Sequence, residues 1–442
     1  MRIMVDMSAT LLHYGHIRLL KQAKKIGHVV VGLTRDEEIL SKKGYKPEMA
    51  YEYRKELLEA LSDVDEVVET PWLISEDVLD QYNIDLLLHG DDNCNEISPD
   101  RLKVVSRTQR ISSMDLRHGA LNSLVSIANK KKLLTPGPGR LLGANLEGLM
   151  PCFGRGDDSY DVVEDRVLGH LKEMTGHSHI ARMQGSASLA IEVAITNFVY
   201  GKCLVIDSGY YSQRMVQMAQ ALAQTDLIGV VEVVSLQELD AVSGSYDWIL
   251  STYTETASAL KNDVLAFSKL AKQVGARFLL DATGSIGLED HHNVADVVCY
   301  SSCKGLLGLT GAAFVAFNEF PKNEVSSFSL SLHTYLEKKC TGPYHAISSL
   351  DHVLHNHDKV RQSIIEAKNN MMDRLKDRVV RPMVDQPVLC TLVEGKVISK
   401  ENDVVLYQPR DVAAGTSVIC HLGEADITGQ PTNDIWDKII IE

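Results

Sequence analysis

Two histidines, His13 and His16, stand on either side of a Tyr-Gly pair near the start of the chain. A predicted strand, Arg2–Met7, ends shortly before them, and a predicted helix, Ile17–Ile26, begins directly after them. The free N–H groups of a helix N-terminus attract anions, and imidazoles can donate to phosphate oxygens as charge builds in a transition state. The spacing therefore predicts a polyphosphate site with His13 and His16 as catalytic residues. For this tetrapeptide alone, capping or surface histidines are an equally good interpretation.

A second set of reactive residues surrounds Lys304, which follows the predicted strand Val297–Ser301. A desolvated lysine can form a Schiff base. Asp281 ends another predicted strand and could pair with a pyridinium nitrogen, which keeps such a ring an electron sink. Ser186 opens an apolar helical run that suits a phosphate, and Tyr211 supplies a ring that could stack. Each residue alone is explained as a surface, cap or core residue, but together they favour a pyridine cofactor.

The composition limits the class of protein that carries these residues. Of the 442 residues, 45 % are hydrophobic and 24 % charged, as in ordinary globular proteins. The formal charge of −14 argues against nucleic-acid or anionic-membrane partners bound through bulk charge. We see neither a membrane-length apolar run nor a signal peptide, and the eight cysteines include no CxxC pair. We therefore expect reduced thiols and a cytoplasmic enzyme without nucleic-acid or membrane partners.

The elements that must position the two histidines alternate between strand and helix. After Arg2–Met7 and Ile17–Ile26 we expect a strand at His28–Leu33, a helix at Pro47–Leu61, and strands at Val64–Glu69 and Ile84–His89. This rhythm predicts a Rossmann-like α/β domain over residues 1–115, with ligands at the carboxyl ends of its parallel strands. The rhythm stops after this domain, and we interpret residues 116–132 as a linker.

A second α/β block is expected to position Lys304 and Asp281. Its predicted strands are Leu204–Asp207, Val230–Ser235, Trp248–Tyr253, Phe278–Asp281, Val297–Ser301 and Ala312–Phe317, with helices such as Val264–Val274 between them. A helical stretch, Leu350–Leu375, and short strands at Val388–Val393 and Val404–Gln408 suggest a small α/β subdomain over roughly residues 345–442. The block as a whole is predicted to span residues 133–442.

Further motifs in the first domain stand in an order that resembles a known family. Lys46-Pro47, the segment Tyr51–Arg54, His89-Gly90-Asp91-Asp92 and the segment Arg107–Ser113 follow the histidine pair. Together these motifs resemble the HxGH cytidylyltransferases that act on glycerol 3-phosphate or phosphoethanolamine.

This resemblance implies in-line attack of a phosphate or phosphonate oxygen on the α-phosphorus of CTP, with Mg²⁺ neutralising the departing pyrophosphate. It implies no protein side chain as a metal ligand. His13 and His16 would stabilise the transition state. The implied nucleotide-binding residues are Ser8, Ala9, Lys46, Asp91, Arg107, Thr108, Ile111, Ser112 and Ser113. Thr10 stands where the family often has Asp, Asn93 where Trp often follows, and Arg110 where Gly is common.

The second block resembles the class V, fold-type I pyridoxal-phosphate-dependent transferases, with 2-aminoethylphosphonate:pyruvate transaminases as the nearest type. The motifs are Leu134–Pro138, Gly185–Ser188, Ser208–Arg214, Tyr253–Thr256, Asp281–Ser285, Ser301–Gly305 and Thr341–Pro343. The resemblance implies pyridoxal 5′-phosphate, an amino donor and a carbonyl acceptor, with Lys304 as catalytic residue. The implied cofactor-binding residues are Ser186, Ala187, Ser188, Tyr211, Thr256, Asp281, Thr283, Lys304 and Thr341, the last reaching the phosphate across a homodimer interface.

The second block departs from this family near its end. An Arg-Ile-Gly segment, whose arginine binds the anionic group of the substrate, is replaced by Ile419–Gly423. We therefore name His421, a weaker and pH-dependent anion ligand, and Arg410 as candidate substrate-binding residues.

Three hypotheses cover the whole chain. The first is a bifunctional enzyme of phosphonate metabolism that makes an aminated phosphonate and activates it with CTP; 2-aminoethylphosphonate is the preferred substrate. The second is a cytidylyltransferase for an alcohol or amino-alcohol phosphate that carries a drifted aminotransferase-like domain for dimerisation. The third is a regulator that binds a nucleotide and pyridoxal phosphate.

Overall fold

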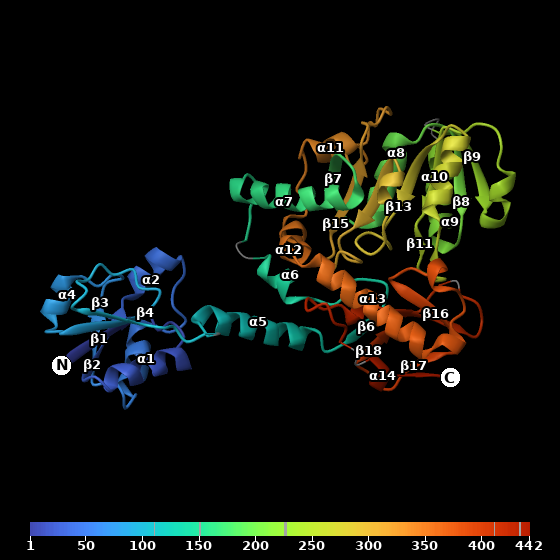
Figure 1. Ribbon diagram of the computed structural model, residues 1–442. Coiled ribbons are helices and arrows are strands. Elements are labelled where there is room, and N and C mark those ends of the chain that lie inside the picture. Colours follow the sequence, from blue (N-terminus) through green and yellow to red (C-terminus); the bar gives the residue numbers. More distant parts are fainter. Residues whose placement is uncertain (110, 150–151, 225–227, 411, 433–434) are drawn as a thin grey trace. The chain divides into compact units, whose positions relative to one another are not determined.

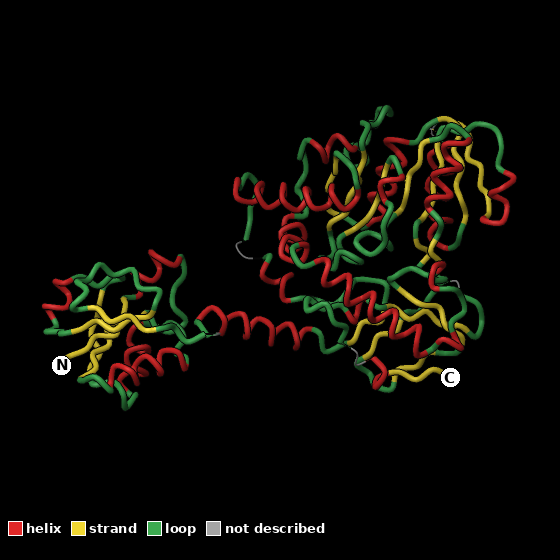
Figure 2. The backbone as a smooth tube through the Cα atoms, in the orientation of Figure 1, coloured by secondary structure: helices red, strands yellow, loops and turns green. Residues whose placement is uncertain are grey.

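The structure is a computed structural model that describes residues 1–109, 111–149, 152–224, 228–410, 412–432 and 435–442 (Figures 1 and 2). The chain divides into two compact units, Met1–Leu124 and Val125–Glu442. We call them the first and the second unit.

The first unit contains a five-stranded, fully parallel sheet in the order β3-β2-β1-β4-β5. Its elements are β1 (Arg2–Met7), α1 (Tyr14–Lys24), β2 (His28–Thr34), α2 (Asp36–Lys43), α3 (Tyr51–Glu59), β3 (Glu66–Thr70), α4 (Glu76–Gln81), β4 (Leu86–Gly90), β5 (Leu102–Val105) and α5 (Ser113–Ala128). The strand order reverses between β1 and β4, and open α/β sheets bind ligands at such a point. The predicted Rossmann-like sheet is present.

Helices cover both faces of this sheet (Figure 1). On one face, Ile3 and Val5 of β1 pack with Leu20 of α1 and Leu58 of α3. On the other face, Met4 packs with residues of α4 and its flanking turns. Alternate residues of β1 thus serve opposite cores, which explains the continuous apolar run of the strand.

Helix α5 occupies most of the segment that was interpreted as a linker. It begins at Ser113, before the predicted boundary, and the first unit reaches Leu124. Helix α2 was not expected; it has three acidic residues in its first turn and ends at Gly44, whose φ of 74° suits glycine. The domain limits at 115 and 133 stay predictions.

The second unit contains a seven-stranded sheet in the order β7-β15-β14-β13-β10-β8-β9. Strand β15 is antiparallel to both of its neighbours, and the other pairs are parallel. Its strands are β7 (His179–Gln184), β8 (Gly201–Asp207), β9 (Ile228–Ser235), β10 (Trp248–Thr252), β13 (Arg277–Asp281), β14 (Val297–Ser301) and β15 (Ala312–Phe317), with a small hairpin of β11 (Thr254–Glu255) and β12 (Leu260–Lys261). The helices of this part are α6 (Gly143–Glu147), α7 (Asp158–Thr175), α8 (Ala187–Phe198), α9 (Tyr210–Ala223), α10 (Val264–Gln273), α11 (Leu332–Leu336) and α12 (Tyr344–Leu354).

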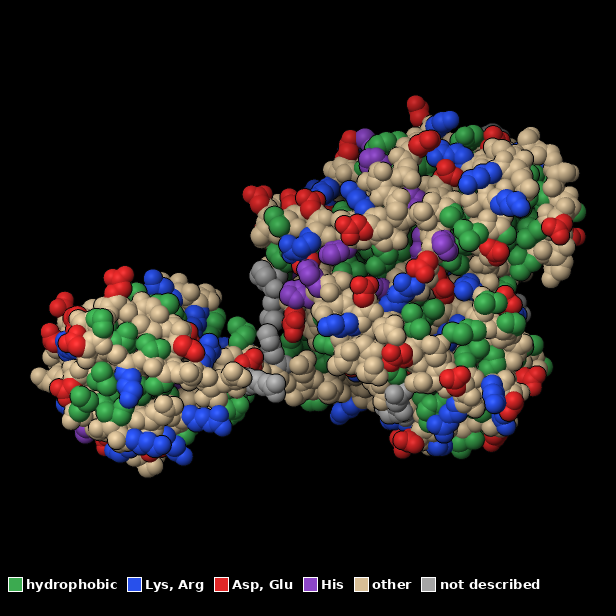
Figure 3. All heavy atoms as spheres, in the orientation of Figure 1, with side chains coloured by type: hydrophobic (Ala, Val, Ile, Leu, Met, Phe, Trp, Pro, Cys, Tyr) green, Lys and Arg blue, Asp and Glu red, His purple; other side chains and the backbone are tan. Residues whose placement is uncertain are grey.

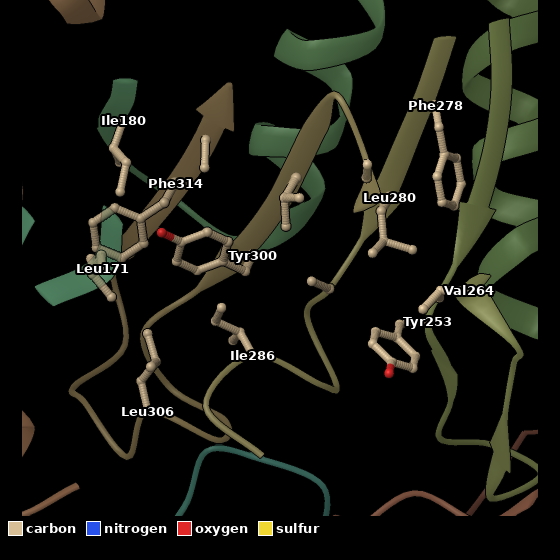
Figure 4. Close-up of a cluster of buried hydrophobic side chains, with 14 of the residues drawn as sticks. Leu171, Ile180, Tyr253, Val264, Phe278, Leu280, Ile286, Tyr300, Leu306 and Phe314 are labelled. Carbon is tan, nitrogen blue, oxygen red and sulfur yellow. The ribbon is translucent and has the colours of Figure 1, made fainter. Parts of the chain in front are cut away.

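Both faces of this sheet are buried, as the apolar strands predict. One core joins α7, α10 and α12 to the side chains that Figure 4 shows, including Leu280, Tyr300 and Phe314. The opposite core joins α8, α9 and α11 to alternate strand residues such as Leu279 and Cys299. Because helices pack against both faces of the sheet, the ends of its strands are held in place. Asp281 is the last residue of β13, and Lys304 follows β14.

The C-terminal part is built from short strand pairs and one long helix. The helix is α13 (His357–Arg374), separated from α12 by a break at His355 and Asn356, so the single predicted helix is two. The remaining elements are β6 (Lys132–Leu134), β16 (Cys390–Glu394), β17 (Val397–Ser399), β18 (Val404–Leu406), β19 (Thr416–Cys420), α14 (Ile435–Lys438) and β20 (Ile439–Ile441). Because β6 pairs in parallel with β18, residues from the start of the unit join the predicted small subdomain.

Surface and cysteine properties complete the description. On the face seen in Figure 3, basic and acidic side chains are interspersed over both units. Within the described residues, we find no helix with the length and apolarity needed to cross a membrane. All eight cysteines are free thiols.

Candidate active sites

A cavity of about 630 Å³ lies at the carboxyl ends of β1 and β4 in the first unit. Its lining includes the predicted residues Ser8, His13, His16, Arg107, Thr108, Ile111, Ser112 and Ser113. The structure therefore brings most of the predicted nucleotide-binding set together at the point where the strand order reverses.

The two histidines are held by the first turn of α1. The Gly15 N–H donates to His13 Nδ1 over 3.2 Å, and the His13 N–H donates to His16 Nδ1 over 3.3 Å. The two rings stack with centroids 3.9 Å apart. Because both Nδ1 atoms accept hydrogen bonds, each neutral ring carries its proton on Nε2. The helix cap thus fixes the tautomer that leaves an Nε2–H donor on each histidine.

Burial favours the neutral form of both imidazoles in the free protein. It lowers the pKa of His16 to about 3, with further contributions from His13, Lys43 and Arg107. The pKa of His13 is also lowered, by burial and by Arg107. Neutral donors surrounded by cations suit a ligand that brings negative charge with it, as a triphosphate does.

Two backbone features explain the residues around the histidines. A Cβ on Gly15 would lie 2.9 Å from His13 Nδ1 and 3.3 Å from Ile111 Cγ2, so the capping ring leaves room only for glycine. Ala9, in the loop before α1, has a φ of 43°, a strained conformation for alanine. Ala9 is buried and does not line the cavity, so its predicted contact would come from its backbone.

The cationic side chains of the cavity differ in part from those expected. Lys46 is exposed and lies outside the lining, whereas Lys43, at the end of α2, lies in it. Lys43 Nζ donates to Ser8 Oγ over 3.0 Å and lies 5.4 Å from the ring centroid of Trp72. The basic run before Gly44 was the available signal for this residue, but α2 had not been predicted.

The segment after β5 contributes the remaining predicted groups. Arg107 pairs with Asp92 over 3.3 Å, and its N–H donates to Asp91 Oδ2. Asp91 does not line the main cavity; it lines a neighbouring hollow of about 460 Å³ together with Arg107 and Ser112. Ser113 Oγ donates to the Leu11 carbonyl, which ties the start of α5 to the histidine loop. Arg110 lies outside the described residues.

Sequence reasoning missed several polar residues of this cavity. Asp6, at the end of β1, has a buried Oδ1 without a hydrogen bond in the described structure, and His89 Nε2 lies 3.6 Å from it. Arg117 of α5 donates to Thr10 Oγ1 and pairs with Glu48. The signal for Asp6 was its position at a strand end, and His89 stands in the quoted His89-Gly90-Asp91-Asp92 motif, although no role was assigned to it. The pairing of Arg117 could not be predicted, because it depends on tertiary contacts.

One buried arginine builds the loop that carries Ser8. Arg54 of α3 donates to the Ser8 and Thr34 carbonyls and pairs with Asp36. It is 1 % exposed, so its role is to join the ends of β1 and β2. As for metals, no three His, Cys, Asp or Glu side chains converge on one point among the residues described. Mg²⁺ commonly binds through substrate phosphates and only one or two carboxylates, so the expected Mg²⁺ stays a prediction.

The second candidate site lies at the carboxyl ends of β13 and β14. Asp281 is 7 % exposed, and its Oδ1 accepts hydrogen bonds from the N–H and the hydroxyl of Thr283. Burial raises the pKa of Asp281, while Thr283, Lys304 and Arg214 lower it. The Lys304 ammonium thus lies within electrostatic reach of Asp281. A Cβ on Gly137 would meet Lys304 Cγ at 2.8 Å, so glycine is needed there for this approach.

Tyr211 stands beside the lysine at the start of α9. Lys304 Nζ lies 5.4 Å from the centroid of the Tyr211 ring. The buried carboxylate of Glu255 fixes the backbone of the tyrosine, because it accepts from the N–H groups of Tyr211 and Ser212 over 2.9 and 2.7 Å. Glu255 is a missed positioning residue, although it stands in the Tyr253–Thr256 motif quoted for the family.

The predicted phosphate-binding residues are well placed for that role. Ser186 is the N-cap of α8, and Ala187 and Ser188 begin this twelve-residue helix. Arg214 Nη1 donates to Ser188 Oγ over 2.9 Å. Thr256 is buried, and its side chain interacts with Tyr407. Thr341 is exposed, which leaves its predicted role across a dimer interface untested.

These residues fit pyridoxal phosphate. A lysine amine, a buried carboxylate, an aromatic face and a helix N-terminus are the groups that a pyridine aldehyde with a phosphate requires. Lys304 would hold its carbonyl carbon, Asp281 its ring nitrogen, and Ser186, Ala187 and Ser188 its phosphate. The Thr256 hydroxyl would supply a further polar contact.

The two candidate substrate-binding residues lie in different surroundings. His421 is 0 % exposed and its Nε2 faces Thr391 Oγ1 at 2.9 Å, while burial lowers its pKa to about 3. A buried, neutral histidine is a poor ligand for a substrate anion, which argues against that expectation. Arg410 is exposed and donates to Tyr210 Oη over 2.5 Å. The structure thus favours Arg410 of the two.

The comparisons with known proteins agree with this division. The Cytidylyltransferase-like family profile matches residues 9–128. An ethanolamine-phosphate cytidylyltransferase of Arabidopsis thaliana is 36 % identical over 133 residues, which cover 26 % of this chain and 31 % of the relative. The chain thus spans about a third of that relative.

The second unit has relatives of a different kind. A 2-aminoethylphosphonate–pyruvate transaminase of Bacillus cereus is 26 % identical over 307 residues, which cover 62 % of this chain and 89 % of the relative. The solved structure of a pyridoxamine-pyruvate aminotransferase of Mesorhizobium loti matches with a TM-score of 0.59 at 17 % identity, over 68 % of this chain and 88 % of that structure. The chain therefore joins a cytidylyltransferase-like domain to a domain with the fold-type I aminotransferase fold, as the motifs predicted.

Proposed function

We propose that the chain is a bifunctional enzyme with one active site in each unit. The first transfers a cytidylyl group from CTP to the phosphonate or phosphate oxygen of a small molecule, and the second carries out pyridoxal-phosphate-dependent transamination. The helix-capped histidine pair in the cavity of the first unit carries the first assignment. Lys304, Asp281 and Tyr211 at one sheet edge carry the second.

In the first site, the protein binds a triphosphate with cations and donors. Lys43 and Arg107 would hold the phosphates that leave as pyrophosphate. The Nε2–H groups of His13 and His16 would donate to the α-phosphate oxygens, where charge builds as the acceptor oxygen attacks. Because the rings are fixed by the helix cap, little reorganisation is needed in the transition state.

In the second site, the bound cofactor supplies an electron sink for the substrate's α-carbon. Asp281 would pair with the ring nitrogen and keep it protonated. Burial raises the pKa of Asp281, but Thr283 and Lys304 act in the opposite direction and favour the carboxylate. Lys304 would form the covalent link and then move the proton at the reacting carbon. Tyr211 would hold the ring plane, positioned in turn by Glu255.

The two activities fit one route if the product of one site is the substrate of the other. Amination of a phosphonate aldehyde gives an aminoalkylphosphonate, and its phosphonate oxygen can then attack CTP. We infer 2-aminoethylphosphonate as the shared compound, supported by the transaminase relatives of the second unit. We also infer that Mg²⁺ accompanies CTP, that the second unit forms a homodimer and that the enzyme is cytoplasmic.

A second candidate function rests on His421 and on the first unit's relatives. If the second unit has lost amino transfer, the first would serve an alcohol or amino-alcohol phosphate, as the name of the plant relative suggests. The retained Lys304 and Asp281 argue against this loss.

Two assays test the proposal. Pyrophosphate release from CTP is measured with 2-aminoethylphosphonate, phosphoethanolamine and glycerol phosphate as acceptors. Borohydride reduction of the protein with pyridoxal phosphate, followed by peptide mapping, should label Lys304. Failure to release pyrophosphate with any acceptor would refute the first activity, and no label on Lys304 would refute the second. Faster turnover with glycerol phosphate than with the phosphonate would refute the shared compound.

A further inference from the structure

Two arginines of the second unit meet at one tyrosine without an acidic partner. Arg410 Nη1 donates to Tyr210 Oη, and the guanidinium carbons of Arg410 and Arg214 lie 5.3 and 5.9 Å from the Tyr210 ring centroid. Both arginines lower the pKa of Tyr210, with the hydrogen bond from Arg410 as the largest cause. Two positive charges therefore converge on one phenol oxygen.

Several other arginines of this unit are paired with carboxylates. Arg166 pairs with Asp351, Arg182 with Glu164, and Arg361 with Asp290. Within the described residues, neither Arg214 nor Arg410 has an ion pair of this kind. Arg214 lowers the pKa of Asp281, but its contribution is smaller than those of burial, Thr283 and Lys304. Uncompensated guanidiniums that converge on one point are the donor set expected of an anion site.

The position of this pair relates it to the reacting lysine. The Tyr210 and Tyr211 rings meet edge to face with centroids 5.3 Å apart, and Lys304 Nζ lies 5.4 Å from the Tyr211 centroid. Arg410 also interacts electrostatically with Tyr211. The Tyr211 ring therefore lies between an anion held at Tyr210 and the amine of Lys304.

The number of cations indicates the kind of anion. Guanidiniums match phosphoryl oxygens with pairs of N–H donors, and two of them balance the two charges of a phosphonate or phosphate. A carboxylate carries one charge and would leave one guanidinium uncompensated. Arg214 also contacts Ser188 at the start of α8, so the phosphate of the cofactor is a second source of the same chemistry.

We propose that Arg214 and Arg410, held together by Tyr210, form the subsite for the phosphoryl dianion of the substrate that undergoes amino transfer. This inference rests on the proposed transaminase function of the second unit. It assigns the anion-binding role to an arginine pair that comes from α9 and from the segment after β18.

The test compares two amines with the same two-carbon spacer, 2-aminoethylphosphonate and β-alanine, on the full chain loaded with pyridoxal phosphate. Their apparent affinities are read from the change in cofactor absorbance, and cofactor affinity is measured separately by equilibrium dialysis. We expect Arg410→Gln and Arg214→Gln each to weaken 2-aminoethylphosphonate about tenfold or more and β-alanine far less, because a hydrogen bond to a charged group contributes about 1.5–3 kcal/mol. Arg361→Gln, which removes an arginine paired with Asp290, is the matched control.

The outcomes show whether the arginines bind the dianion of the substrate, the phosphate of the cofactor, or neither. Unchanged affinity for 2-aminoethylphosphonate in both variants overturns the proposal. A loss of cofactor affinity with an unchanged preference for the phosphonate assigns the arginines to the cofactor's phosphate and also overturns it. If Arg214→Gln does not fold, Arg214→Lys and Tyr210→Phe serve instead, with the same selective loss expected. A wild-type protein in which borohydride labels no Lys304 refutes the transaminase function itself, a result that these variants cannot produce.

Discussion

His13 and His16 are held by the first turn of a single helix, whereas Lys304, Asp281 and Tyr211 come from three separate strand ends of the larger sheet. The first site is built by local hydrogen bonds between neighbours in sequence. The second depends on the register of β8, β13 and β14 and on a buried carboxylate under α9. The electrostatics differ as well, because burial favours the neutral form of His16 in the first site, whereas in the second site Lys304 and Arg214 act against the effect of burial on Asp281.

This difference has consequences for substitution. A change in the locally built site should reduce catalysis and leave the rest of its unit intact. In the second site, Lys304 is the residue that we propose for the covalent link, so its loss should abolish that activity. The units are compact by themselves, so damage to one site should spare the other.

The largest effect is expected for Lys304→Ala. Without the amine, both the covalent link and the proton transfer are lost, and transamination should fall by about 10⁴-fold, the upper range for loss of a positioned proton-transfer group. Amino transfer from 2-aminoethylphosphonate to pyruvate is the measurement. Pyrophosphate release from CTP should stay at the wild-type rate; a parallel loss of both activities would contradict the independence of the two sites.

The next effect is expected for His16→Ala. Removal of one preorganised donor to a developing charge costs about 10²–10³-fold in rate, and the capping hydrogen bond from the His13 N–H is lost as well. Pyrophosphate release at saturating CTP should show the drop while amino transfer is unchanged. Near-wild-type pyrophosphate release by this variant would show that His16 takes no part in the reaction.

A smaller effect, on the KM for CTP, is expected to distinguish Lys43 from Lys46 in the first unit. Lys43 lines the cavity and Lys46 does not, so Lys43→Ala should raise the KM for CTP by about tenfold, the value of one charge-assisted hydrogen bond. Lys46→Ala should change it by no more than about twofold, as for an exposed substitution. CTP saturation curves of both variants give the answer. A larger increase in KM for Lys46→Ala than for Lys43→Ala would show that Lys46 binds the nucleotide, as the sequence predicted.

These lysines also show where prediction from sequence fails. The histidine pair could be predicted because its geometry follows from four consecutive residues and the helix after them. The strands Val297–Ser301 and Ala312–Phe317 could be predicted because both faces are buried and the runs are continuously apolar. Lys43 was missed because α2, which presents it, has a mostly polar sequence with little apolar periodicity.

The anion ligand of the second site illustrates the same limit at longer range. His421 follows β19, whose pairing with β16 buries it against Thr391, and no local pattern reveals that pairing. Arg214 stands at the end of the quoted Ser208–Arg214 motif, but nothing in that motif indicates that Tyr210 also contacts Arg410, a residue 200 positions away. Such contacts depend on tertiary structure alone.

The smallest effect is expected from pH, and it tests the neutral character of the first site. Burial lowers the pKa of His16 to about 3, so in the free protein the ring should be almost entirely uncharged from about pH 5 upward and become protonated only at lower pH. An ordinary imidazole, with a pKa of about 6.5, would instead gain its charge in the middle of the range from about pH 5 to about pH 8.

Because kcat/KM reports ionisations of the free enzyme and the free substrate, the ratio of kcat/KM for wild type to that for His16→Asn should be constant from about pH 5 to about pH 8. Ionisation of CTP changes both values equally and cancels in the ratio. Pyrophosphate release over this range is the measurement, with stability at each pH checked by thermal unfolding. A ratio that changes several-fold around pH 6.5 would show that His16 titrates normally before CTP binds. His16 would then gain a positive charge within this range, and the electrostatic contrast between the two sites would fail.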